Sequence, residues 1–383
     1  MELRTIIDAY IDVNILLALS LGLWFLARRI LTALGLPHAY ATQLRLLYGV
    51  FLATLISPVL AAAIGAVSAS GAVGASYSVN LSDFVTAQYL NGSFAMTPSA
   101  FEEVLGFRSR LTGGMVYLDT PLGVALVTFM VSGFAIAALR LGLGFRRLCR
   151  IVSASTVWRR FGTLELRVSD TVSVPFSTRT LRRRIIVVPS SILASPDDLK
   201  IALSHEFQHL RQYDLEWEIA LELLRPFFFW NPAYALWKRN FEVLRELSCD
   251  RNVLAQGSID AERYGTSLLN ICENSLRPRR LFAVEVPRVA LVETRKPFLG
   301  RDSAVLLRQR LDSLFEGRHE RHPRALFALF FVPLLAVTLT GSMAIQKSDD
   351  WSYDRLMLST IVNLERLEAI NGGSSAGLLA QRP

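Results

Sequence analysis

The sequence predicts a mainly α fold, with four membrane-spanning helices and an α+β domain between the third and the fourth. The first observation is composition: 51% of the 383 residues are hydrophobic and only 19% are charged, whereas soluble proteins carry about 25% charged residues. The second is a mean hydropathy of +0.34. The third is a set of four apolar stretches of roughly 20 residues, the length that a helix needs to cross a bilayer. Disordered, collagen-like and disulfide-scaffold chains are excluded, the last because the three cysteines are few and scattered.

The apolar stretches run over about 6–26, 46–69, 121–143 and 325–345. The first is the weakest, because Asp8, Asp12 and Asn14 lie in its opening turns. Pro58 and Pro333 lie inside the second and the fourth, where bilayer helices tolerate proline. Helices buried in a large soluble core are the alternative, which the arginines at the ends of the stretches disfavour. A cleaved signal peptide is disfavoured by the acidic N-terminal segment.

Arginines set the expected orientation. They follow the first stretch, follow the third and precede the fourth, at Arg28, Arg29, Arg45, Arg140, Arg146, Arg147, Arg150, Arg318, Arg321 and Arg324. Cytoplasmic loops carry such an excess. We therefore expect a multi-pass protein of a bacterial-type inner membrane with both termini outside. Arg108 and Arg110 lie in the expected outer loop and are outnumbered. Orientation and anionic lipid explain the net charge of +8, so a nucleic-acid partner is not needed.

The expected domains are two spans with a cytoplasmic loop, an external loop, the third span, a cytoplasmic domain, the fourth span and an external tail, at 1–69, 70–120, 121–144, 145–322, 323–346 and 347–383. The external loop is either a small sensing module or a partly ordered linker on the membrane surface. The cytoplasmic domain begins with strand-like pieces at 164–168, 172–176 and 185–189, which predict a small sheet of two to four strands.

Three helices are expected after these strands. Ser195 before Pro196 is typical of an N-cap, and Asp198 stands where a capping box has its acid. Asp214 is placed to cap a second helix, which is a simpler account than a role in orienting the first of these helices, and Asn231 is placed to cap a third that ends near residue 255.

His205 and His209 lie four residues apart on the first of these helices, so both imidazoles project from one face with the spacing that holds one zinc ion. The carboxylate of Glu206, next to the first histidine, can reach a water molecule bound to the zinc rather than the metal itself, and can take a proton from that water as general base. Because a catalytic zinc takes three protein ligands and keeps one position open, a third ligand is required. Glu246 is the candidate, with Asp250 one turn on to accept the free N–H of a ligand histidine.

Several nearby residues have simpler interpretations. Taken alone, Glu242 fits a solvated helix face with Glu–Arg pairs, and Cys249 fits a buried small side chain. The aromatic run 227–230 is interpreted as an interfacial belt or as packing against the spans, in preference to a substrate groove. No residue that stabilises the oxyanion can be selected from the sequence.

Six segments carry a resemblance: Val174–Phe176, Val187–Pro189, Ser204–His209, Phe229–Pro232, Arg245–Asp250 and Leu307–Leu311. Together they resemble the BlaR/MecR-type antirepressor family of integral-membrane zinc metallopeptidases over most of 1–345. The resemblance implies a gluzincin-like domain with one zinc per chain, held by His205, His209 and Glu246. It also implies Glu206 as general base and Asp250 behind the ligands. Its further implication is signal-triggered cleavage of the protein itself or of a cytoplasmic target, often a transcriptional repressor.

The β-lactam sensors of that family carry a penicillin-binding domain with a Ser-x-x-Lys nucleophile after the last span. Here about 38 residues follow Ile345 and contain no such motif, so β-lactam recognition is not expected. Two alternatives stay open. One is a prenyl-protein or heat-shock type of membrane zinc peptidase, which shares the histidine motif. The other is a non-catalytic signalling protein with structural zinc, in which Glu206 has no use. A homo-oligomer also stays open.

Overall fold

The computed structural model describes residues 2–69, 81–93, 95–180, 182–276, 289–290, 302–315, 323–345 and 356–367. The chain forms two compact units, which are described separately. The first comprises residues 1–24, 48–131 and 329–383, and the second comprises residues 25–47 and 132–328.

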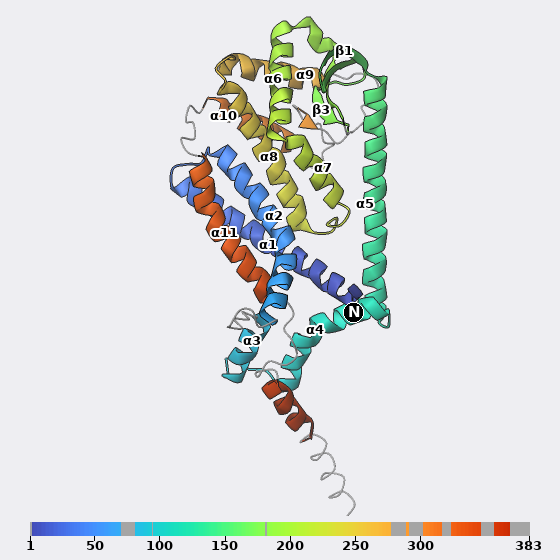
Figure 1. Cartoon of the computed structure of the whole chain (residues 1–383), viewed down its shortest axis with the longest axis vertical. Coiled ribbons are helices and arrows are strands. Elements are labelled where there is room, and N and C mark those ends of the chain that lie inside the picture. Colours follow the sequence, from blue (N-terminus) through green and yellow to red (C-terminus); the bar gives the residue numbers. More distant parts are fainter. Residues whose placement is uncertain are drawn as a thin grey trace, which may run out of the picture. The chain divides into compact units, whose positions relative to one another are not determined.

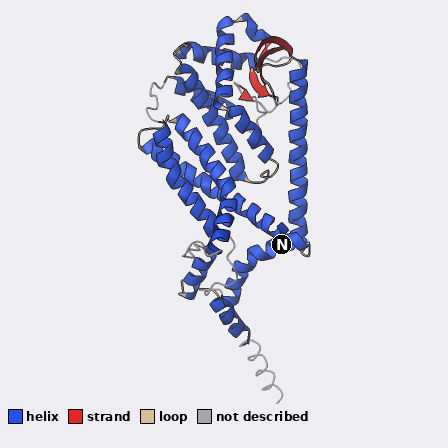
Figure 2. Ribbon diagram, in the orientation of Figure 1, coloured by secondary structure: helices blue, strands red, loops and turns tan. Residues whose placement is uncertain are grey.

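Four long helices correspond to the predicted spans: α1 (Glu2–Ala33), α2 (Tyr40–Ala69), α5 (Pro121–Ala154) and α11 (Pro323–Ile345). Each is long and apolar enough to cross a membrane, which confirms four candidate spans in a mainly helical fold (Figures 1 and 2). α5 continues well past Arg140, since arginine and leucine are good helix formers. The apolar stretch therefore marks the part that fits a bilayer, and the helix itself extends further.

The first unit contains helices in the segments expected outside the membrane. They are α3 (Leu81–Leu90), α4 (Pro98–Tyr117) and a helix at residues 356–367. Phe101 of α4 packs with Leu358 and Val362 in a small buried cluster. The described parts of the outer loop and the tail therefore share a core.

Arg108 of α4 ties this core to two of the long helices. Its guanidinium lies 2.7 Å from Asp12 and 3.2 Å from Asp8 of α1, and it donates to the carbonyl oxygen of Ile345 at the end of α11. The first turns of α1, the external loop and the end of α11 are therefore held together by one charged side chain.

The second unit contains a five-stranded sheet in the order β1-β2-β4-β3-β5. The strands are β1 (Thr156–Phe161), β2 (Leu164–Ser169), β3 (Phe176–Arg179), β4 (Arg184–Pro189) and β5 (Val289–Ala290). β2 and β4 run parallel, and the other pairs run antiparallel.

The predicted number of strands, two to four, is wrong, because the sheet has five. The strand predicted at 172–176 is wrong except for Phe176, where β3 begins. Val172 and Val174 are buried without pairing, so their alternation reports burial alone, and Pro175 has no N–H to give to a ladder. β1 was not predicted, because all six of its residues are exposed and no alternation marks it.

The second unit also contains five helices among its described residues, α6 (Pro196–Gln212), α7 (Asp214–Leu224), α8 (Pro232–Leu254), α9 (Ala261–Leu276) and α10 (Asp302–Leu314), with a 3₁₀ turn at Ser190–Ala194. The core lies between β4, which is buried along its length, and apolar residues of α6, α7 and α9. Two predicted caps are confirmed. Ser195 accepts the N–H of Asp198 at 3.4 Å, and Asn231 accepts the N–H of Ala233 at 2.9 Å. These caps fix where α6 and α8 begin and so which residues they turn toward each other.

Candidate metal centre

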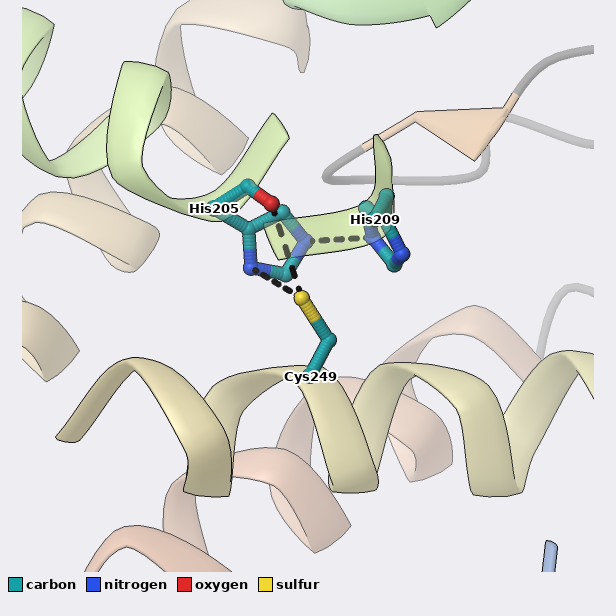
Figure 3. A group of neighbouring side chains, drawn as sticks. All are labelled: His205, His209 and Cys249. Atoms are coloured by element: carbon teal, nitrogen blue, oxygen red, sulfur yellow. Dashed lines mark hydrogen bonds between the residues drawn. The ribbon is translucent and has the colours of Figure 1, made fainter. Parts of the chain in front are cut away.

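α6 presents two fully buried imidazoles on one face. Nε2 of His205 lies 3.0 Å from Nε2 of His209, and the ring centroids are 4.6 Å apart (Figure 3). The spacing of one helical turn that the sequence predicted thus makes the two outer nitrogens converge. Two converging nitrogen lone pairs are the start of a cation site.

Glu246 on α8 completes the convergence. Its carboxylate oxygens lie 3.4 Å from Nε2 of His205 and 3.6 Å from Nε2 of His209. Ligand atoms about 2.1 Å from a tetrahedral zinc stand about 3.4 Å from one another, and the three separations here are 3.0, 3.4 and 3.6 Å. The donor set therefore fits one ion of this size. Glu242, one turn earlier, instead lies 3.4 Å from Lys238 and is buried, so the interpretation of a solvated helix face is wrong for this residue.

The inner nitrogens of both imidazoles have acceptors. Nδ1 of His205 lies 2.7 Å from the hydroxyl of Tyr264 on α9 and 3.2 Å from Asp250. Tyr264 in turn donates to Asp250 at 2.6 Å. Nδ1 of His209 lies 2.7 Å from Asp214. Such partners favour a proton on Nδ1 and leave Nε2 free to bind a metal.

The prediction that Asp214 caps α7 is wrong. The N-cap is Tyr213, in the left-handed conformation with φ of 59°, and Asp214 is the first helical residue, with its carboxylate turned back to His209. The sharp elbow at Tyr213 brings the start of α7 against α6. A buried imidazole N–H needs an acceptor more than a helix terminus that water can reach.

Arg310 on α10 places a positive charge behind the acids. It donates to both oxygens of Asp250 at 2.7 Å and lies 3.2 Å from Glu246. Burial is the largest single effect and raises the pKa of each carboxyl, but the guanidinium and the imidazole contacts together outweigh it, so that both pKa values are lowered, that of Glu246 to about 2. Both acids are therefore ionised, which is the state in which a carboxylate binds a metal.

Glu206 is fully buried beside the two imidazoles. Neither of its oxygens has a hydrogen-bond partner of normal geometry among the described residues. Burial raises the pKa of this carboxyl, and the imidazoles and Ser177 of β3 moderate the rise. A buried acid without a partner is costly. The buried carboxyl of Glu206 is therefore a candidate for a group that takes part in a reaction.

Cys249 forms with His205 and His209 a buried cluster that is compatible with a metal ion. Its sulfur lies 3.6 Å from Nδ1 of His205 and 3.5 Å from the carbonyl oxygen of that residue (Figure 3). The thiol thus contacts His205 on its Nδ1 side, whereas Nε2 faces Glu246. Its full burial matches the small buried side chain that we expected, but its position against an imidazole was not foreseen.

Sequence reasoning also missed Tyr264 and Arg310. A signal for Arg310 was present, because it lies at helical spacing among Leu307, Leu311 and Leu314. A charged residue on an apolar helix face needs a buried partner of opposite charge. Its partners lie about sixty residues earlier in the chain, so the sequence alone did not identify them.

Comparison with known proteins bears on this geometry. The family model described as BlaR1 peptidase M56 matches residues 12–292, well over half of the chain. No curated protein matches it. The matched segment contains both histidines, Glu206, Glu246, Asp250 and Tyr264. Arg310 lies beyond it.

Proposed function

The chain belongs to the BlaR1 peptidase M56 family, and from that premise we propose that it is a membrane-embedded zinc endopeptidase of the His-Glu-x-x-His type. The observation that carries the proposal is the convergence of His205, His209 and Glu246 at separations of 3.0 to 3.6 Å, with the unpaired carboxyl of Glu206 beside them.

In this proposal the two imidazoles and Glu246 hold one zinc ion per chain, and the fourth position stays open. When bound, zinc polarises the peptide carbonyl and makes water more acidic. Asp250 and Tyr264 orient His205, and Asp214 orients His209, each through the Nδ1 nitrogen.

Glu206 acts as general base in this proposal. Its carboxylate takes a proton from the attacking water and passes it to the leaving amine. Burial of the site keeps bulk water away from the carboxylate, and its raised pKa brings it closer to the pH at which it must exchange protons. A structural zinc site gives this costly side chain no role, which favours an enzyme over a zinc-stabilised scaffold.

The proposed topology places both termini and residues 70–120 outside and the peptidase domain, residues 145–322, in the cytoplasm. Contacts within each unit support this alternation. In the first unit Arg108 contacts Asp12 near the start of α1 and Ile345 at the end of α11, two helix ends that the proposed topology places on the same, outer side of the membrane. In the second, Thr42 in the first turn of α2 donates to the carbonyl oxygen of Pro323 at the start of α11.

We further propose that a signal received outside triggers cleavage of the protein itself or of a cytoplasmic or membrane regulatory protein, such as a transcriptional repressor. The shared core of the outer loop and tail supports an external module that could receive such a signal.

The test compares full-length wild type with Glu206→Gln, purified from membranes. We expect both to bind about one zinc per chain. Loss of a general base costs about 10²- to 10⁴-fold in rate, so Glu206→Gln should lose proteolysis. Protein fragments compared between cells that carry wild type and Glu206→Ala would identify the substrate. Full cleavage by the Glu206 variants would show that the base is assigned wrongly.

Three further variants test the ligand set. Glu246→Ala should lose zinc, whereas Glu242→Ala, one turn away, should keep it. Cys249→Ala should also keep it, because the thiol lies on the Nδ1 side of His205. If Cys249→Ala lost the metal and Glu246→Ala retained it, the third ligand would be the thiolate.

A further inference from the structure

The hairpin formed by α7, the turn 225–231 and the start of α8 has an apolar outer surface. Its large exposed side chains are here called the hairpin face: Ile219, Leu223, Phe227, Trp230 and Leu236. Between residues 217 and 238 one charged side chain, Arg225, is exposed, and it lies 3.5 Å from Glu222. A soluble helical hairpin shows the opposite pattern, with polar residues outside.

The other charged side chains between residues 217 and 238 are buried or half-buried and compensated. Lys238 lies at the centre, paired with Glu222 and within 3.5 Å of Glu218 and Glu242. Arg245 adds a second cation, 2.6 Å from Glu218. Charges enclosed among themselves beneath an apolar exterior are typical of segments that face lipid.

Residues of the hairpin also form hydrogen bonds with the backbone groups of the turn. Asn231 is buried, accepts the N–H of Ala233 and donates its own N–H to Phe228. The carbonyl oxygen of Leu221 near the end of α7 accepts both the N–H of Arg225 and the hydroxyl of Tyr234. A turn at the water surface needs no such provision, whereas a turn inside a bilayer requires it.

The tip of the hairpin contacts the apolar part of a span. Phe229 packs against Gly133 of α5 so closely that a Cβ there would meet the ring at 2.1 Å, and Phe227 stacks edge-on to Phe134, with centroids 5.1 Å apart. Figure 1 shows the two elements side by side. Gly133 lies seven residues before Arg140, which is about 10 Å along the helix. The tip thus lies at a level of α5 that belongs in hydrocarbon.

We propose that the α7–α8 hairpin is a re-entrant membrane element whose face contacts lipid acyl chains about 10 Å below the level of Arg140. Glu246 follows Pro232 by fourteen residues, or about 21 Å along α8. The metal centre then lies at most about 11 Å above that level, next to the lipid headgroups. The hairpin anchors the centre at the bilayer surface, where peptide segments next to a membrane can reach it. This inference rests on α5 being a span but not on peptidase activity.

The test places a fluorescent bimane on single cysteines of the full chain in lipid bilayers. Cys149 and Cys272 are changed to Ser, and the buried Cys249 is kept. The probe sites are Phe227→Cys on the hairpin face and Phe161→Cys on β1, matched because the two phenylalanines are 52% and 56% exposed. Ile136→Cys reports α5 at a similar level. Quenching by lipids brominated in the acyl chain is compared with quenching by aqueous iodide.

We expect the probe at 227 to match that at 136, with strong quenching by brominated lipid and quenching by iodide several-fold weaker than at 161. Lipid contact at 136 together with iodide quenching at 227 would overturn the hairpin proposal alone. Iodide quenching at both positions would overturn it together with the span. Protection of 227 from both quenchers would also overturn it, since a protein surface would then cover the face. None of these outcomes depends on catalysis.

Discussion

Removing the hydrogen-bond acceptor at Nδ1 should weaken zinc binding more when the acceptor belongs to His209 than when it belongs to His205. Nδ1 of His209 has one oxygen acceptor within hydrogen-bonding distance among the described residues, Asp214 at 2.7 Å. Nδ1 of His205 has two, Tyr264 at 2.7 Å and Asp250 at 3.2 Å. Zinc on Nε2 fixes the proton on Nδ1, so an absent acceptor penalises the bound state.

The size of each effect follows from these contacts. Asp214→Ala leaves a buried N–H without an acceptor, which costs about 1–3 kcal/mol, or about 5- to 150-fold in zinc affinity. Tyr264→Phe leaves Asp250 within reach of His205, and Arg310 still neutralises that acid. Its cost should stay at or below about tenfold, the low end for partners behind a metal ligand.

Competition with a chromogenic chelator, on purified protein in bilayer discs, measures both affinities. Tyr213→Phe is the matched control, because this exposed tyrosine precedes Asp214 and should leave affinity unchanged. Circular dichroism checks that each variant is folded. Equal losses for Asp214→Ala and Tyr264→Phe, or the reverse order, would refute the assignment of the inner partners.

Two further predictions concern stability. Arg108→Ala should lower the thermal midpoint of the full chain, since Asp8 and the nearly buried Asp12 lose their counter-charge. Because a quarter of the Arg108 side chain is exposed, we expect the free energy of unfolding to fall by about 1–3 kcal/mol, less than for a fully buried pair. An unchanged midpoint would contradict this. Burial raises the pKa of Glu165, but hydrogen bonds from Arg167 and Arg183 outweigh it and the net pKa is lowered. Glu165 therefore stabilises the fold above its unfolded pKa of about 4.3, and this contribution is lost as pH falls through the lower folded value. The difference in thermal midpoint between wild type and Glu165→Gln should shrink below about pH 4, and a constant difference would exclude the mechanism.

Local signals account for the parts of the fold that the sequence predicted. Apolar runs mark the four candidate spans, because length and hydropathy alone decide whether a helix fits a bilayer. The caps at Ser195 and Asn231 were identified because the backbone N–H groups that donate to them lie within three residues in the chain. β1 was missed because it lacks such a local signal: all of its residues are exposed, two of them are arginines, and no alternation marks the strand.

The metal centre shows where local reasoning ends. The spacing of His205 and His209 fixes their shared face, and Glu246 could be chosen because it lies in an apolar stretch of its helix. Tyr264 and Arg310 reach the site from separate helices, and Asp214 reaches it through an elbow at Tyr213. Their roles depend on how α7, α9 and α10 pack, which no short pattern encodes.

α8 explains why Glu246 rather than a neighbouring acid faces the imidazoles. On one side of it Glu242 is compensated by Lys238, and on the other Asp250 is compensated by Arg310 through two bonds of 2.7 Å. Each neighbour thus lies against a cation, Lys238 or Arg310. Glu246 shares Arg310 at the longer distance of 3.2 Å, so its carboxylate is held ionised while both oxygens stay near Nε2 of the histidines. The charges on either side orient the proposed ligand, and this ordering along one helix leaves a buried carboxylate that a metal ion can bind.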